Sequence, residues 1–238
     1  MKTGSCFLMR IAPRVSLAAT EDRVTTVLVT GYEPFSTFDL NPSALVARAL
    51  DGTDVSGVSV VGRVLPVDLA AMPGVLRDLL ERHAPDLALG LGLAAGITSI
   101  NVERVAVNLA DLSRMPDNRG LAVADAPLAA DGPDAFFATV PTRRIVERLQ
   151  AEGIPAALSY SAGTHLCNAV LYHLLCAAHD RTPAYRAGFL HLPLLPEMAA
   201  GQPAATPSMD FDMMRRAVQL AVEVAVEVAI GPALSING

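Results

Sequence analysis

The stretch SYSAGTHLCN, residues Ser159–Asn168, joins an apolar segment typical of a β-strand to an apolar segment typical of a helix. A turn of small residues connects the two, and Cys167 follows near the predicted start of the helix. A thiol there experiences the positive end of the helix dipole and unpaired backbone N–H groups. Both favour the thiolate, which is the nucleophilic form of cysteine. Because free cysteines are often core residues, the stretch alone leaves a structural role for Cys167 equally open.

The same succession of strand and helix recurs on both sides of this stretch. Continuous apolar runs predict strands buried on both faces, and helical spacing of apolar residues predicts amphipathic helices. The predicted strands are Val24–Thr30, Val58–Leu65, Asp86–Leu91, Val102–Leu109, Ala156–Ser161 and Ala187–Leu192. The predicted helices are Pro42–Leu50 (capped by Asn41), Asp68–His83, Thr142–Glu152, Thr164–Ala178 and Ser208–Ile230. This alternation implies an α/β fold, a single-domain three-layer α/β/α sandwich around a mostly parallel, twisted sheet.

In a sheet of this kind, binding sites lie at the carboxyl ends of the strands. Gly31, the loop Ile97–Asn101, the turn Ser161–Cys167 and His191 all fall near predicted strand ends. We therefore expect several chemically capable groups on one rim of the sheet.

The composition excludes several classes of protein. Hydrophobic residues make up 52% of the 238 residues and the net charge is −6, which predicts a full core and argues against a general nucleic-acid surface. No stretch approaches the ~20 apolar residues that span a bilayer, so we expect no membrane association. Cys6, Cys167 and Cys176 are irregularly spaced and odd in number, which favours a reducing, cytoplasmic location over a disulfide framework.

The first residues are less patterned than the rest. Arg10, Arg14 and Arg23 interrupt the apolar residues there, which argues against a signal peptide. We predict that residues 1–23 are a loosely ordered extension and that residues 24–238 form one domain.

Motifs that follow one another from Val24 to Glu197 carry a resemblance. They are TGYEPF followed by NPS (Asn41–Ser43), GLAAGITSINVERVAVN (Gly92–Asn108), MPDN (Met115–Asn118), the cysteine stretch, and AGFLHLPLLPE (Ala187–Glu197). In this order they resemble the motifs of the pyroglutamyl peptidase I (pyrrolidone-carboxylate peptidase) family of cysteine peptidases. The resemblance implies a catalytic domain, residues 24–238, that removes an N-terminal pyroglutamyl residue from peptides without a metal or organic cofactor. It also implies a homotetramer or homodimer.

The resemblance further implies a catalytic triad. Cys167 aligns with the nucleophile, His191 with the base and Glu103 with the acid that orients the imidazole. Backbone N–H groups beside Cys167 are the expected donors to the oxyanion. From the residues alone, a core histidine is the lesser alternative for His191, whereas a surface ion pair with Arg104 is the favoured interpretation of Glu103.

A pyroglutamyl group is a neutral five-membered lactam. Its pocket needs an apolar slot, a donor for the ring carbonyl and an acceptor for the ring N–H, but no carboxylate for an α-amine. By resemblance, Phe35 and Tyr32 line this slot, Asn41 lies beside it and Arg114 lies close to the catalytic centre. Core packing of Phe35 and helix capping by Asn41 are the structural alternatives. Leu93 stands where the family usually has a glutamine that helps to bind the lactam.

Other departures from the family pattern surround the expected pocket. Ser36-Thr37 replace a Gly-Gly pair, and His165 replaces an aromatic residue. They keep open a thiol amidase of the same fold that acts on another small lactam or acyl-amide. A non-catalytic binding relative is the second alternative.

Two weaker patterns remain. The glycines of Gly90–Gly96 loosely resemble a phosphate-binding loop, but the lysine is missing and a strand-to-loop turn explains them. His173, Cys176 and His179 have three-residue spacing on one helix, but no fourth ligand is evident. We therefore expect no metal site.

Overall fold

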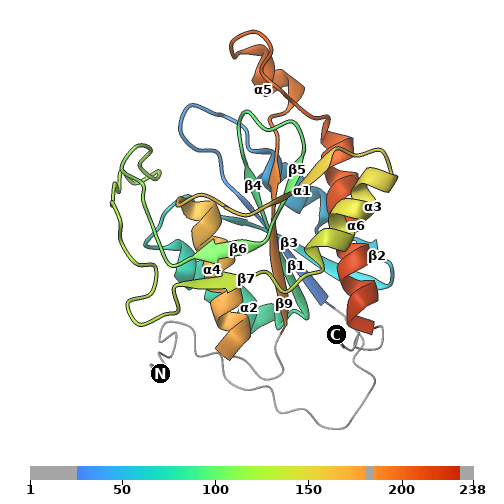
Figure 1. Cartoon of the computed structure of the whole chain (residues 1–238), viewed down its shortest axis with the longest axis horizontal. Coiled ribbons are helices and arrows are strands. Elements are labelled where there is room, and N and C mark those ends of the chain that lie inside the picture. Colours follow the sequence, from blue (N-terminus) through green and yellow to red (C-terminus); the bar gives the residue numbers. More distant parts are fainter. Residues whose placement is uncertain (1–25, 181–184, 231–238) are drawn as a thin grey trace.

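The computed structural model describes residues 26–180 and 185–230, and in them a central sheet runs between two layers of helices (Figure 1). Its strands are β1 (Thr26–Tyr32), β2 (Asp54–Val55), β3 (Val58–Leu65), β4 (Leu87–Leu93), β5 (Ile100–Glu103), β8 (Ala156–Ser159) and β9 (Arg186–Leu192). Their spatial order is β2-β3-β1-β4-β9-β5-β8. β3, β1, β4 and β9 are parallel neighbours, as are β5 and β8, whereas β5 runs antiparallel to β9 and β2 antiparallel to β3. The predicted mostly parallel sheet is confirmed.

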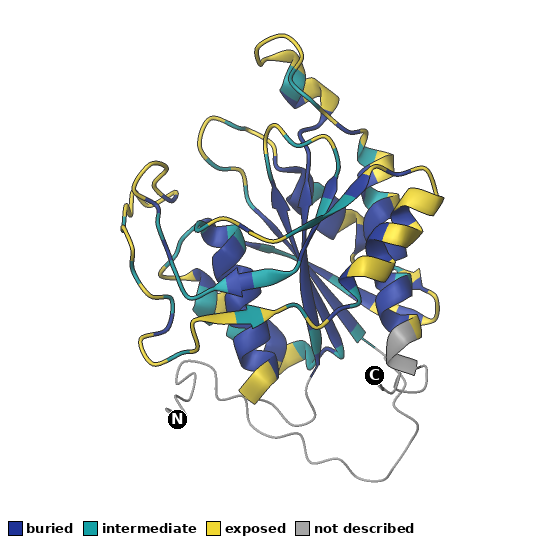
Figure 2. Ribbon diagram, in the orientation of Figure 1, coloured by how far each residue is buried: buried dark blue, intermediate teal, exposed yellow. Residues whose placement is uncertain are grey.

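Helices cover both faces of this sheet. One core lies under α1 (Pro42–Leu50), α3 (Thr142–Ala151) and α6 (Phe211–Ile230), and the other lies under α2 (Met72–His83) and α4 (Leu166–Asp180). A short helix, α5 (Pro196–Ala200), follows β9. Figure 2 shows that the strands and the sheet-facing sides of the helices are buried. The predicted three-layer α/β/α sandwich is confirmed.

The helix starts show local sequence rules at work. Asn41 caps α1 as predicted, because its Oδ1 accepts the Ser43 N–H at 3.1 Å. α2 starts later than the predicted Asp68, since the Asp68 carboxylate accepts the N–H groups of Ala70 and Ala71 and closes a turn first. The sequence pattern located both helices and missed the turn before the second.

The prediction of one strand over Val102–Leu109 is wrong. The chain leaves the main sheet after β5, and β6 (Val105–Val107) pairs antiparallel with β7 (Ala135–Phe137) in a separate two-stranded sheet. Asn168 of α4 holds β6 in place: its Oδ1 accepts the Val107 N–H and its Nδ2 donates to the Val107 carbonyl, both at 2.9 Å. A continuous apolar run in a sequence does not show that its first residues belong to one sheet and its last residues to another.

Some predictions fall outside the described residues. The expected N-terminal extension, residues 1–23, lies there, and one domain over residues 24–238 stays a prediction. Within the described segments, no helix combines the length and the apolar character needed to cross a membrane.

Candidate active site

Three elements meet at one edge of the main sheet. β9 carries His191, β5 carries Glu103, and Cys167 is the second residue of α4, which packs over β4 and β9. In the strand register, His191 lies opposite Gly92 on β4 and opposite Asn101 on β5. The structure brings Cys167, His191 and Glu103 together on the α4 side of the sheet. The expected rim of strand carboxyl ends holds for His191, but Glu103 reaches it from β5, which runs antiparallel to β9, as does β8 before Cys167.

The histidine and the glutamate form a buried pair. His191 Nδ1 donates to Glu103 Oε1 at 2.8 Å, and the two residues are only 8% and 1% exposed. With Nδ1 committed to the carboxylate, Nε2 is the ring nitrogen left to interact with the Cys167 side chain, which raises the pKa of His191 against the effect of burial. This is the geometry by which an acid fixes the tautomer of a catalytic imidazole.

The electrostatics of His191 favour the protonated ring. Burial opposes its charge, but the Cys167 side chain and then the Glu103 carboxylate outweigh burial and raise the pKa of His191 to about 10. The site therefore holds an imidazolium next to the sulfur at neutral pH, which is the partner that a thiolate needs.

Cys167 is the free cysteine among the described residues. It is half-buried at the start of α4, where the first N–H groups of a helix have no intrahelical acceptor. The Tyr32 hydroxyl, at the end of β1, donates to the Leu166 carbonyl at 2.6 Å and so fixes the start of α4 against the sheet. Cys176 is fully buried in α4 and does not offer a second free thiol.

The attribution of Gly90 and Gly92 to a strand-to-loop turn is wrong, because both lie within β4, where they leave room for Phe189 and the Cys167 sulfur. A Cβ on Gly92 would lie 2.6 Å from Cys167 Sγ and 2.8 Å from the ring of Phe189. The Phe189 ring in turn packs edge-on against His191, with centroids 5.0 Å apart and planes at 64°. A Cβ on Gly90 would likewise overlap the ring of Phe189. Both glycines therefore serve close packing inside β4 and do not form a turn.

A second pair of rings lies beside Cys167. Phe35 and His165 are both half-buried, and their ring centroids are 6.4 Å apart with planes tilted by 31°. His165 Nε2 donates to the Met115 carbonyl at 2.9 Å. Burial lowers the pKa of His165 despite opposing contributions from Met115 and Asp117, so the ring is neutral at neutral pH.

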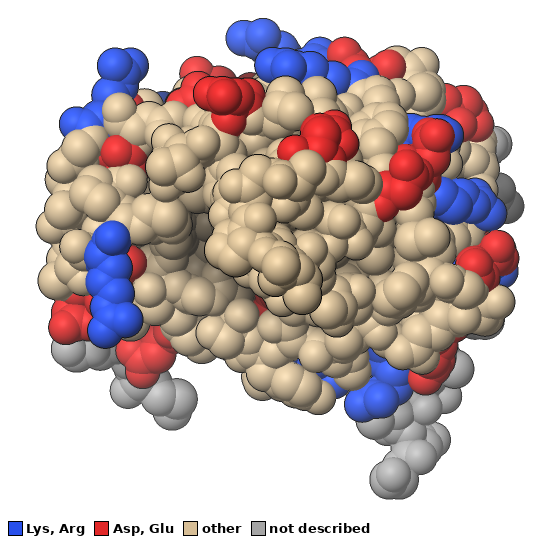
Figure 3. Space-filling view, turned by 90° about the horizontal axis from the view of Figure 1, so that it is seen from above, with Lys and Arg blue, Asp and Glu red and all other residues tan. Residues whose placement is uncertain are grey.

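The face that carries these groups is hollowed. Figure 3 views the molecule from above, at the end where the loops follow the parallel strands, and shows a recess bordered mostly by uncharged residues. Such a recess suits a neutral ligand better than a charged one.

The other residues expected in the pocket occupy different environments. Leu93 ends β4 and is 7% exposed, and Arg114 is exposed on the long connection between β6 and β7. Tyr32 is 3% exposed and belongs to the core beneath α4. Asn41 is 2% exposed; its Oδ1 accepts from Ser43 and its Nδ2 donates to the Glu33 carbonyl. The structural alternative for Asn41, a helix cap, is therefore fulfilled.

No metal cluster lies in the part of the chain that the structure describes: His, Cys, Asp and Glu side chains do not gather there in groups of three or more able to hold an ion. His173 is 3% exposed inside α4, and burial lowers its pKa to about 4. Its surroundings are those of a neutral core histidine.

A family model described as pyroglutamyl peptidase matches residues 25–228. The chain belongs to the pyroglutamyl peptidase family. A pyrrolidone-carboxylate peptidase of Pyrococcus furiosus is 43% identical over 199 residues, which cover 82% of this chain and 94% of the relative. One from Chromobacterium violaceum is 47% identical over 180 residues, covering 76% and 83%. The solved pyrrolidone carboxyl peptidase of Thermococcus litoralis superimposes with a TM-score of 0.83 at 38% identity, covering 86% of this chain and 94% of that one.

Membership of the pyroglutamyl peptidases confirms the resemblance seen in the motifs and makes the chain a cysteine peptidase. The family match covers the positions of Cys167, His191 and Glu103.

Proposed function

We propose that this pyroglutamyl peptidase releases N-terminal pyroglutamate from peptides through a triad of Cys167, His191 and Glu103. One observation carries the assignment: His191 Nδ1 lies 2.8 Å from Glu103 Oε1 in a buried pair, and, against burial, the Cys167 side chain is the largest influence that raises the pKa of the same ring. This supports the roles of nucleophile, base and orienting acid for the three residues.

The reaction steps follow from these three residues. The Cys167 thiolate attacks the scissile carbonyl carbon, which joins the pyroglutamyl residue to the rest of the peptide. As the S–C bond forms, the π electron pair of the C=O bond moves onto the carbonyl oxygen. When this intermediate collapses, the C–N bond breaks and the His191 imidazolium gives its proton to the leaving amine. A water molecule then attacks the thioester, and His191 takes one of its protons. Breaking the S–C bond releases pyroglutamate and regenerates the thiolate.

The start of α4 supports the charged intermediate. Unpaired N–H groups there are suited to donate to the oxyanion. Tyr32 keeps this end of the helix in position, and its phenol stays protonated because burial, and then the charge on Cys167, raise its pKa well above the usual range. Tyr32 therefore acts through Leu166 rather than on the substrate.

Recognition rests on Phe35 and His165, whose ring centroids are 6.4 Å apart with planes tilted by 31°, His165 being two residues before Cys167. A planar, neutral lactam can pack against these flat rings, whereas a peptide with a free α-ammonium would need a carboxylate. Leu93 ends β4 as part of the core under α1, α3 and α6, and Arg114 lies on the connection that Met115 ties to His165. Asn41 contributes by fixing the Glu33 carbonyl at the base of the loop that carries Phe35.

The thiol amidase with another small lactam or acyl-amide is the second candidate. It is favoured by Leu93, an apolar side chain where a polar partner for the lactam could stand, and by Asn41, whose amide is already bonded within the chain. A pyroglutamyl ring must then depend on backbone groups and on His165.

Turnover of a fluorogenic pyroglutamyl amide, next to its prolyl and alanyl analogues, tests both candidates. We expect the pyroglutamyl amide to be preferred and Cys167→Ala to lose turnover by at least about 10⁴-fold. Near-normal turnover by Cys167→Ala would remove the triad. Equal turnover of the prolyl and pyroglutamyl amides would favour the second candidate.

The assembly and location of the enzyme stay predictions. We infer a homotetramer or homodimer that acts in the cytoplasm on peptides with N-terminal pyroglutamate. Light scattering of the purified chain tests the assembly, and a monomer at micromolar concentration would contradict it.

A further inference from the structure

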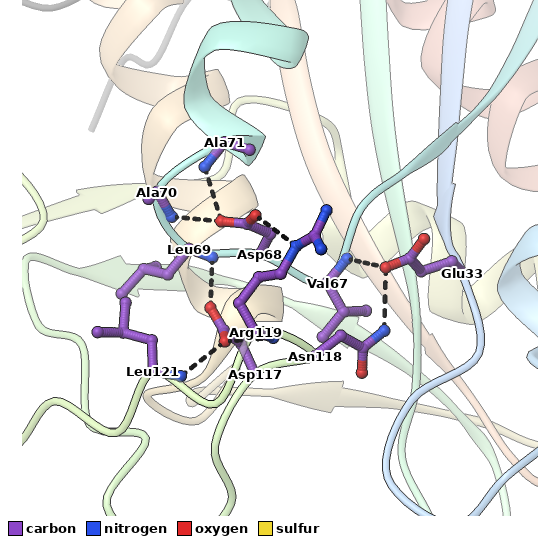
Figure 4. Close-up of polar contacts among 10 residues, drawn as sticks. All are labelled: Glu33, Val67, Asp68, Leu69, Ala70, Ala71, Asp117, Asn118, Arg119 and Leu121. Carbon is purple, nitrogen blue, oxygen red and sulfur yellow. Dashed lines mark hydrogen bonds and ion pairs between the residues drawn. The ribbon is translucent and has the colours of Figure 1, made fainter.

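The connection between β6 and β7 contains a segment, Met115–Leu121, that is bound to other loops around the active site (Figure 4). Asn118 is its main link to the loop after β1. The Asn118 side-chain amide donates to Glu33 Oε1 and to the Pro34 carbonyl, each at 2.9 Å. Its backbone N–H donates to the Val67 carbonyl, also at 2.9 Å. Phe35 comes directly after Pro34, so Asn118 holds the backbone that presents this ring.

Glu33 completes the link. Its Oε1 accepts the Val67 N–H at 3.0 Å in addition to the Asn118 amide. One carboxylate oxygen therefore joins the loop after β1, the loop after β3 and the segment Met115–Leu121 (Figure 4).

Asp117 fixes the shape of the segment. Its carboxylate accepts three backbone N–H groups, from Leu69, Arg119 and Leu121, each at 2.9 Å. Burial opposes its charge, but these three bonds lower the pKa of Asp117 below its usual range. The carboxylate is thus charged at neutral pH, when charge-assisted bonds of this kind are strongest.

The other end of the segment is attached to the nucleophile's turn. The Met115 carbonyl accepts from His165 Nε2 at 2.9 Å, and nearby the Asp111 N–H donates to the Thr164 carbonyl at 2.9 Å. Met115 and Asn118 are three residues apart, so a short piece of chain connects the Phe35 loop to His165.

We propose that Asp117 and Asn118 are positioning residues that set the distance between the Phe35 and His165 rings. The inference rests on the proposed recognition of the pyroglutamyl ring by these two side chains. The ring centroids are 6.4 Å apart with planes tilted by 31°, and the segment Met115–Asn118 is bonded at one end to the His165 side chain and at the other to the Phe35 loop. Neither side chain needs to touch the substrate.

Asn118→Ala tests the proposal. Removing the amide frees the Phe35 loop, so we expect KM for the pyroglutamyl amide to rise about tenfold, the loss expected for a hydrogen bond to a charged group. We expect kcat and the rate of Cys167 alkylation by iodoacetamide to stay within about twofold of wild type, because the triad lies on other elements. Arg119→Ala is the matched control: its guanidinium pairs with Asp68 at 3.4 Å, is 80% exposed and does not reach the Phe35 loop.

A pair of exchanged side chains provides the rescue. Asn118→Asp sets a carboxylate against Glu33 and should raise KM more than Asn118→Ala. Adding Glu33→Gln restores one amide-to-carboxylate bond, so the double variant should recover a lower KM than Asn118→Asp alone. Thermal melting of every variant separates a change in stability from a change in KM, and Glu33→Gln alone serves where Asn118→Ala does not fold.

Three results would overturn the proposal. The first is a KM for Asn118→Ala no higher than that of Arg119→Ala. The second is a loss of kcat and of alkylation rate with KM unchanged, which would place the effect at the nucleophile. The third is a double variant no better than Asn118→Asp. Wild-type enzyme that does not turn over the pyroglutamyl amide would instead remove the proposed function itself, and with it the proposed recognition by Phe35 and His165.

Discussion

The catalytic half of the site and the recognition half are built differently. His191, Glu103 and Cys167 lie on β9, β5 and α4, and His191 and Glu103 are buried at 8% and 1% exposure. Phe35 and His165 lie instead on a loop and a turn, and both are half-buried. The first half is positioned by strand register and core packing, the second by hydrogen bonds between loops.

This difference indicates where each property of the enzyme can change. A substitution in the catalytic half disturbs a packed core, so stability and turnover should fall together. A substitution in the recognition half affects loop contacts, so KM should change with turnover preserved. The predictions below probe that separation, from the largest expected effect to the smallest.

His191→Ala should give the largest loss. It removes proton transfer to and from the reacting groups, which is worth roughly 10²–10⁴-fold in kcat. Glu103→Gln keeps the shape of the acid but not its charge, so its loss should be smaller. Steady-state kinetics of both variants provide the comparison. If Glu103→Gln is silent while His191→Ala is inactive, the site is a dyad and Glu103 is structural.

Gly92→Ala should couple stability to catalysis. Its Cβ would lie 2.6 Å from Cys167 Sγ and 2.8 Å from the Phe189 ring, so the core must shift at a cost of about 1–3 kcal/mol. We expect kcat to fall about 100-fold, because displacement of a reacting atom has an effect of that order. Gly74→Ala is the control, because a Cβ at this position of α2 would meet no atom within 4 Å. Alanine in place of glycine in a helix adds about 0.5–1 kcal/mol of stability. Equal kinetics for the two variants would contradict the packing argument.

The charge on His191 should depend on Cys167. The pKa of His191 is raised above its ordinary value of 6.5 to about 10, with Cys167 the largest raising influence against burial. The stabilisation from the charged ring is therefore complete below pH 6.5 and is lost as pH rises through about 10. NMR titration should find a lower pKa for His191 in Cys167→Ala than in wild type. An unchanged pKa would mean that Glu103 alone holds the proton.

Leu93→Gln should have the smallest effect and should fall on the recognition half. A glutamine at the end of β4 offers the lactam a polar partner, so kcat/KM for the pyroglutamyl amide should rise roughly two- to tenfold. The prolyl amide, which lacks the ring carbonyl, provides the control and should not gain. A parallel gain for both amides would show that Leu93 does not face the lactam.

The sequence predicted the catalytic half better than the recognition half. Cys167, His191 and Glu103 lie in motifs with a fixed order, which located all three. The carboxyl-end rule applies to His191 on β9, whereas Glu103 meets His191 because β5 runs antiparallel beside β9. Gly92 was visible as a glycine inside an apolar run, yet its reason, the Cys167 sulfur, lies 75 positions away along the chain. Glycines within a strand signal a close approach, but the sequence does not say of what.

The contacts between loops were not predictable from local patterns. Asn118 and Asp117 stood in a recognised motif, but their partners, Glu33 and Leu69, lie 85 and 48 residues away. Asn168 likewise fixes β6 through side-chain bonds across 61 residues, and the chain was expected to continue as one strand there. Side chain-to-backbone bonds of this kind leave no periodic trace in a sequence.

Glu103 makes the active site a local weakness of the fold. One of its carboxylate oxygens, Oε2, is buried and has no hydrogen-bond partner among the described residues, although its neighbour Oε1 accepts from His191. An unsatisfied buried oxygen of an acid costs stability, while an apolar side chain of similar size would not. Replacing Glu103 alone would not relieve this cost, because it would leave the buried Nδ1–H of His191 without its acceptor, and breaking one half of a buried pair costs about 3–5 kcal/mol. A screen for thermal resistance that ignores turnover should therefore keep Glu103 or replace it together with His191.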